Sequence, residues 1–325
     1  FGVLAWKYHD HEKSHSTDLD LPGVATLGVS CAALLGFVSA MGIDGFPWSI
    51  SALLFVVALA AGAWFVQIER TAVNPIMPLS LITNRAIGPA LIGSGLMGIA
   101  FFGVDTYVPL YVQGTTGAGA KAAAGVVTPV MLAWAISGIF AAPMIVRWGF
   151  RRTAIIGSWL TAISFVGLLI GAILQVHGAV LAAVLAVGGL GFGSASMPYL
   201  LSAQHGVDWQ QRGIVTSAVQ FSRTMVGAIG IGLLGMLFNV LAAPQMEQLR
   251  QMGVSPATIM DPHQRDSLPA AAKPIVFNMI GSGLTWVFAA MAFFAILQIG
   301  ISLLMPKAED HVTAAQTDLM EALPG

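Results

Sequence analysis

Two charged side chains lie inside long apolar stretches of this sequence, where ionisable groups are rare. Asp105 follows the middle of the stretch Ala86–Val112 by about six residues, and Arg223 precedes the middle of Gly213–Ala243 by about five. A charged aspartate at the centre of a membrane helix costs about 2.5–3.5 kcal/mol, so such residues usually face a cavity or a partner. A carboxyl at this depth could exchange a proton or hold a cationic substrate. A guanidinium could attract anionic groups or influence a carboxylate.

Each of these two residues also has a purely structural interpretation. Asp105 would then be a wetted or hydrogen-bonded carboxyl near the mouth of a cavity. Arg223 would be an arginine held by backbone carbonyls or by another part of the protein. Their positions differ in depth by about 16 Å at 1.5 Å per residue, so we expect no direct ion pair between them.

The elements that must position these residues are membrane-spanning helices. Of the 325 residues, 56% are hydrophobic and 9% are charged, and the mean hydropathy is +0.81. A soluble domain needs about a quarter of its residues charged, so lipid is the expected solvent. Eight apolar stretches are long enough to cross the roughly 30 Å of hydrocarbon: Leu21–Met41, Phe46–Val66, Ala86–Val112, Ala122–Val146, Thr153–Leu174, Ala179–Ala203, Gly213–Ala243 and Ile275–Met305.

The positions of lysine and arginine predict the orientation in the membrane. If the N-terminus is cytoplasmic, the short inner segments carry nine of these residues and the short outer segments carry one, Lys121. Both ends of the chain are therefore expected in the cytoplasm, with the protein in the plasma membrane.

The chain divides into five expected segments. Residues 1–20 form a cytoplasmic loop after a truncated helix, because the first residues read as the last turns of an earlier span, and the chain is expected to be a fragment. Residues 21–67 form a two-helix hairpin, and 68–85 a cytoplasmic loop in which Pro75 and Pro78 break any helix. Residues 86–305 form a six-helix unit with an external loop at 244–274, and 306–325 a cytoplasmic tail.

Glycines recur at helical spacing in two of the spans. Small residues let helix backbones approach closely in a membrane. We expect them to serve ordinary tight packing or, alternatively, a contact that governs conformational exchange; they are Gly189, Gly193, Gly227, Gly230, Gly232 and Gly235. The Gly189–Gly193 run lacks the preceding strand of a dinucleotide fingerprint.

Several classes of site are not expected. The net charge of −1 gives no indication of nucleic-acid binding, and a single cysteine, Cys31, excludes an internal disulfide and a cysteine-rich metal site. His9, His11 and His15 alternate with acidic residues, a pattern typical of a solvated loop. No histidine lies inside a predicted span and no H-E-x-x-H motif occurs, which argues against an intramembrane enzyme. No cofactor or metal is expected.

Several stretches together resemble the major facilitator superfamily, and within it the fourteen-helix drug:proton antiporters of the EmrB/QacA type. They are the segments 75–85, 109–113 and 124–129, the basic loop 147–152, and the segments 212–213 and 223–230. The resemblance implies an all-α integral membrane fold in which a two-helix linker hairpin precedes the six-helix C-terminal half. The six-helix N-terminal half would be missing. Val146 and Ala142 stand where the family's signature loop has an acidic residue and a glycine.

The resemblance also implies a function and further site residues. The function is proton-coupled antiport of small hydrophobic or amphipathic compounds by alternating access, in the lipid bilayer. The alternatives are a dedicated exporter of one lipid or metabolite, and a non-transporting scaffold or sensor. Tyr107, Trp134 and Gln220 lie on spans that line the central cavity of the resembled fold. The basic loop either holds topology or acts as a cytoplasmic latch; its residues are Arg147, Gly149, Arg151 and Arg152.

Overall fold

The computed structural model describes residues 20–43, 46–72, 83–117, 119–254 and 269–306, and this part of the chain is helical with no strand. Seven of its helices are long and apolar enough to cross a membrane. A helix satisfies its own backbone hydrogen bonds, as lipid requires. The helices are α2 (Leu21–Met41), α3 (Trp48–Thr71), α5 (Ile87–Thr116), α6 (Ala120–Ile173), α7 (Gly178–His205), α8 (Arg212–Gln251) and α10 (Lys273–Leu303). The all-α membrane fold is confirmed.

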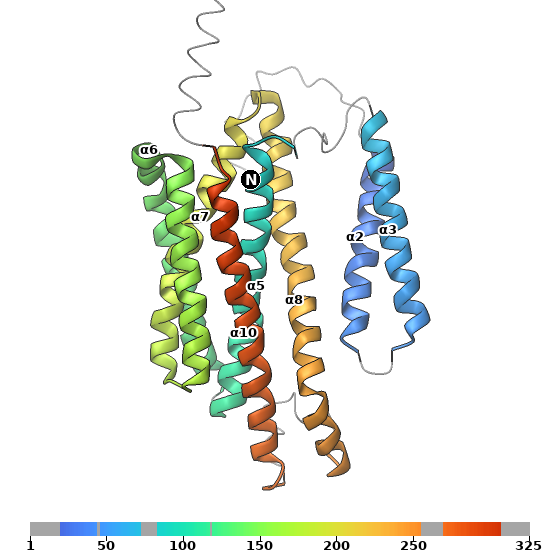
Figure 1. The fold of residues 1–325 in the computed structure, drawn as a ribbon, viewed down its shortest axis with the longest axis vertical. Coiled ribbons are helices and arrows are strands. Elements are labelled where there is room, and N and C mark those ends of the chain that lie inside the picture. Colours follow the sequence, from blue (N-terminus) through green and yellow to red (C-terminus); the bar gives the residue numbers. More distant parts are fainter. Residues whose placement is uncertain (1–19, 44–45, 73–82, 118, 255–268, 307–325) are drawn as a thin grey trace, which may run out of the picture.

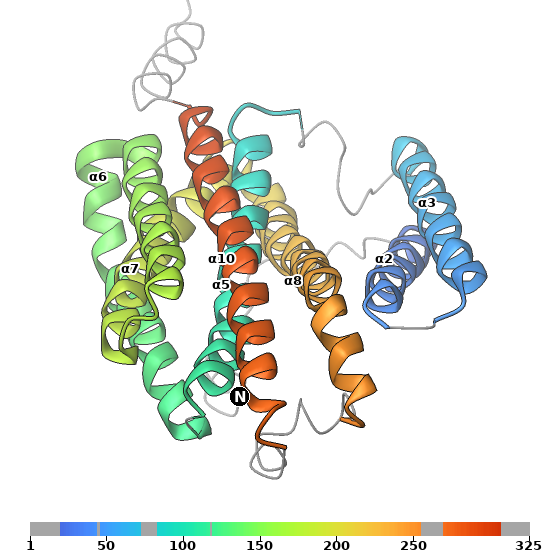
Figure 2. The ribbon, with the colours of Figure 1, turned by 60° about the horizontal axis from the view of Figure 1, so that its bottom comes forward.

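Helix α6 contains both of the spans that the sequence predicts at 122–146 and 153–174. Its 54 residues would extend about 81 Å if straight, far more than the roughly 30 Å of hydrocarbon. The helix is broken at Gly149, whose φ of 78° and ψ of 169° are non-helical, and the ribbon turns back there (Figure 2). Ser137 before the break and Ser158 after it both bond to α7, at Ser194 and Tyr199. The predicted count of eight helices is not confirmed: seven described helices are long and apolar enough to cross a membrane, and the two predicted spans correspond to the two legs of α6 on either side of Gly149.

The bundle of α5, α6, α7, α8 and α10 has α5 near its centre (Figure 1). A buried polar cluster ties three of these helices together. The Tyr199 hydroxyl of α7 lies 2.7 Å from Ser302 Oγ of α10 and 3.3 Å from Ser158 Oγ of α6, and it accepts from Gln298 Nε2 at 3.4 Å. All four side chains are almost completely buried. Since lipid tails are as apolar as leucine, such bonds and close packing must hold the helices together.

The predicted hairpin is formed by α2 and α3. Asp20 caps α2 by accepting a bond from Gly23 N at 2.9 Å, and Ser30 Oγ of α2 donates to the Ala58 carbonyl of α3 at 2.9 Å. The hairpin lies beside α8 (Figure 1), where Asn239 Nδ2 donates to the Gly42 carbonyl at 2.7 Å. Its second helix ends at Thr71, about one turn later than the sequence predicts.

Helix α8 is longer than its predicted span. The external loop was expected to begin at Pro244, but α8 continues through this proline to Gln251. The 40 residues of α8 measure about 60 Å, twice the hydrocarbon thickness. Residues 244–251 of the expected external loop thus belong to α8. The described residues do not include the histidine cluster, Pro75, Pro78 or residues 307–325 of the predicted tail.

Candidate functional site

An aromatic cluster joins three helices of the bundle around Trp134. The Trp134 ring of α6 lies 4.6 Å from the Phe101 ring of α5 and 6.2 Å from the Phe192 ring of α7. Phe101 and Phe192 are 5.8 Å apart. Phe192 is buried, whereas Phe101 and Trp134 remain partly exposed. The accessible parts of the Phe101 and Trp134 rings offer an apolar surface against which a flat or amphipathic molecule could pack.

Asp105 lies one helical turn beyond Phe101, on the same face of α5, because residues four apart are neighbours on a helix. Its side chain is exposed at the surface of the described bundle. The described residues provide it with no hydrogen-bond or ion-pair partner. The Asp105 carboxyl is therefore one helical turn from the aromatic cluster and accessible to a molecule that lies against this face of α5.

Arg223 lies on the other side of the middle of the spans, where α8 crosses α5. It is half-buried, and its Nε donates to Ser94 Oγ at 3.3 Å. Ser222 beside it donates to the Leu91 carbonyl at 2.8 Å, so both residues fasten α8 to α5. Ser94 precedes Asp105 by about 16 Å along α5 at 1.5 Å per residue. The predicted absence of a direct Asp105–Arg223 pair agrees with this geometry.

The structure places the other two expected cavity residues apart from the aromatic cluster. Tyr107 is 5% exposed, and its hydroxyl donates to the Ile231 carbonyl of α8 at 2.6 Å. Its phenol thus bridges α5 and α8 within the bundle. Gln220 is exposed on α8. Phe101 and Phe192 were not singled out from the sequence, because single aromatic residues inside apolar stretches resemble ordinary packing residues.

The chain reverses direction in the basic loop of α6, at Gly149. The φ at this position is positive, which a glycine adopts more easily than a residue with a Cβ. Arg147 and Arg152 are exposed. Arg151 is half-buried and lines a pocket together with Arg85. The loop thus presents two arginines to the surroundings and a third to the pocket.

The predicted glycines have three different helical partners. A Cβ at Gly193 would lie 2.6 Å from the Ser137 side chain of α6, and Gly189 contacts α6 in the same way. Gly227 and Gly230 pack against α5, where added Cβ atoms would meet Phe102 and Ile99 at 2.5 Å. The remaining two glycines contact different helices. Gly232 faces Val38 of α2 in the hairpin, and Gly235 faces the Tyr107 hydroxyl of α5. All six therefore take part in close packing within the described chain.

Comparison with known proteins shows the family. The sequence pattern of the Major Facilitator Superfamily matches residues 22–231. The chain is 30% identical over 224 residues to the multidrug transporter protein MdtP of Bacillus subtilis, covering 68% of this chain and 41% of that protein. It is 24% identical over 329 residues to multidrug resistance protein 3 of the same organism, covering 96% of this chain and 63% of the relative.

A solved structure has the same fold. It is a bacterial homologue of the human lysosomal transporter Spinster, in an inward-facing, occupied conformation. The TM-score is 0.51 at 15% identity, over 87% of this chain and 65% of that one. The chain belongs to the Major Facilitator Superfamily and is a multi-pass membrane protein. It spans about half the length of the curated relatives it matches, 41% of MdtP and 63% of multidrug resistance protein 3.

Proposed function

We propose that the protein exports small hydrophobic or amphipathic compounds from the cytoplasm across the plasma membrane in exchange for protons. The observation that carries this proposal is the position of Asp105. The Asp105 carboxyl is exposed, lies within an apolar helix and is one turn from the aromatic surface formed by Phe101 and Trp134. The names of the relatives, a multidrug transporter and a multidrug resistance protein, support the substrate class.

Transporters of this kind bind substrate near the middle of the bilayer, between two helical bodies that rock against each other. We propose that Phe101 and Trp134 contact the apolar part of the substrate and that the expected six-helix N-terminal half supplies the opposite wall. Asp105 would be neutral when protonated and would attract a cationic compound when charged. Arg223 of α8 would supply a fixed positive charge about 16 Å from Asp105 along the direction of α5, on the other side of the middle of the spans. Both ends of the chain are proposed to be cytoplasmic.

Asp105→Asn tests the proposed proton exchange, because the amide keeps the shape of the side chain but stays neutral. In inverted vesicles, ethidium-induced proton release and pH-driven ethidium uptake should both fall to background. Asp105→Glu should recover part of each. Asp208→Asn, a change at an exposed aspartate outside the spans, serves as the matched control and should behave like the wild type. Proton release by Asp105→Asn at the wild-type level, with equal protein in the membrane, would refute the assigned role.

A further inference from the structure

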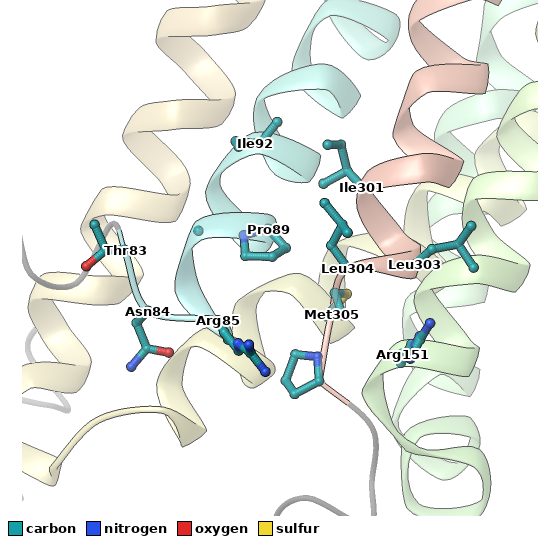
Figure 3. A pocket seen from close by; sticks show the side chains of 12 residues that line it. Thr83, Asn84, Arg85, Pro89, Ile92, Arg151, Ile301, Leu303, Leu304 and Met305 are labelled. Carbon is teal, nitrogen blue, oxygen red and sulfur yellow. The ribbon is translucent and has the colours of Figure 1, made fainter.

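The pocket that Arg85 and Arg151 line lies away from the aromatic cluster, at the end of the bundle where α5 begins and α10 ends. Its volume is about 700 Å³, within the roughly 300–1,000 Å³ typical of small-molecule sites. It lies between the first turn of α5, the end of α10 and the start of the second leg of α6. Figure 3 shows Arg85 on the α5 side and Arg151 on the α6 side, with the last residues of α10 between them.

The polar part of this pocket is positively charged. Arg85 is exposed and Arg151 is half-buried, and the lining contains no aspartate or glutamate. Within the described ranges, no carboxylate is paired with either guanidinium. Arg85 lies in the turn before α5 and Arg151 in α6. Two guanidinium groups from different segments of the chain can bind one phosphate group from two sides, since each presents a planar set of N–H donors.

The remaining wall of the pocket is apolar and faces outward. Ile92 is 54% exposed, Leu303 is 48% exposed and Leu304 is 66% exposed. These residues lie within about two turns of the ends of membrane-spanning helices, so they are close to the boundary between hydrocarbon and lipid headgroups. The arginines lie on the headgroup side of this boundary. The pocket therefore combines a cationic end at headgroup level with an apolar end that faces the acyl chains.

We propose that this pocket binds the headgroup of one anionic phospholipid. Arg85 and Arg151 hold its phosphate, and an acyl chain runs along Ile92 and Leu304. A free phosphate ion would use only the cationic end, so the apolar wall favours a lipid. Basic pockets between transmembrane helices are known to select anionic headgroups. The bound lipid would link α5, α6 and α10 at the point where α6 reverses, and this role is separate from the choice of exported compound.

The test measures lipid binding to the purified full chain. Native mass spectrometry after delipidation would titrate a phosphatidylglycerol and, separately, a phosphatidylcholine with the same acyl chains. The wild type should bind one phosphatidylglycerol in clear preference. Arg85→Gln with Arg151→Gln should weaken this binding by a factor on the order of 30, from the usual contribution of two arginines near a membrane surface. Arg147→Gln with Arg152→Gln removes the same charge from the neighbouring loop but not from the pocket, and should change binding little.

Three outcomes would overturn the proposal. One is equal loss of binding in both double variants, which would indicate general surface charge. Another is binding of glycerol phosphate as tight as that of the lipid, which would indicate a site for a free anion. The third is phosphatidylglycerol binding that is detected only after Glu309→Gln and Asp310→Asn. This result would indicate that these two carboxylates of the chain itself occupy the pocket in the wild type. Should the glutamine pair fail to fold, Arg85→Lys with Arg151→Lys retains the charge and should still prefer phosphatidylglycerol, though less strongly.

Discussion

A single added methyl group at Gly98 should disturb the crossing of α5 and α8. A Cβ at this position would lie 3.0 Å from the carbonyl carbon and 3.3 Å from the Cα of Arg223, and it would collide with the Arg223 carbonyl oxygen. These are backbone atoms, so no side chain can rotate away. The two helices must separate if Gly98 becomes alanine.

The size of the effect follows from two contributions. Forcing an extra methyl group into a packed interior costs about 1–3 kcal/mol. Separation of the helices also stretches the bond from Arg223 to Ser94, and interhelical hydrogen bonds in membranes contribute about 0.6 kcal/mol on average. We expect Gly98→Ala to lower the free energy of unfolding by about 2–3 kcal/mol.

Two further glycines make this a graded series, measured by unfolding in SDS followed by tryptophan fluorescence. At Gly103 the added Cβ would meet the tip of Met291, at 2.5 Å from its Cε. A methionine tip can move, so Gly103→Ala should cost less than about 1 kcal/mol. Gly138 has open space around it, so Gly138→Ala should be neutral or slightly stabilising, since alanine favours helix. A Gly98→Ala protein as stable as the Gly138→Ala protein would refute the described crossing.

Two other predictions concern orientation and core polarity. With Cys31 replaced by serine, a cysteine at Gln251 should react with an impermeant maleimide in intact cells and one at Arg152 should not; the reverse pattern would contradict the proposed orientation. Tyr199→Phe removes a buried hydroxyl that contacts Ser302 at 2.7 Å and two further side chains, and should lower the free energy of unfolding in SDS by about 1–2 kcal/mol. An unchanged midpoint of unfolding in SDS would contradict this prediction. It would show that Ser158, Ser302 and Gln298 form hydrogen bonds with one another when the Tyr199 hydroxyl is absent.

The helices could be predicted from the sequence because hydrocarbon leaves a spanning chain few choices. An apolar stretch of sufficient length must form a helix to satisfy its backbone, so the described helices coincide with the predicted spans to within a few residues at most ends. The depth difference between Asp105 and Arg223 followed from helical rise alone. The family was also predicted correctly, from motifs whose order along the chain was more informative than any one of them.

The contacts between helices could not be predicted in the same way. Lipid-facing and helix-facing positions are equally apolar, so hydropathy does not reveal that Trp134 meets Phe101 or that Tyr107 turns toward α8. The sequence places the end of α8 before Pro244, but the helix continues to Gln251, because a proline inside a membrane protein helix can be tolerated. The two predicted spans in α6 are separated by a break at one residue, Gly149. Amino-acid composition does not reveal the backbone conformation of a single glycine.

The attachment of the α2–α3 hairpin has a mechanical consequence. Its described contacts with the bundle centre on α8, through the Asn239–Gly42 hydrogen bond and the Val38 side chain against Gly232. Because the hairpin is attached along one helix, the bundle and the hairpin can rotate relative to each other about that helix. A rocking bundle that turned about the axis of α8 would keep both contacts, and the hairpin could stay at rest in the surrounding lipid. Among the seven described helices, the displacement of lipid in the proposed transport cycle would then involve the five of the bundle and not the two of the hairpin.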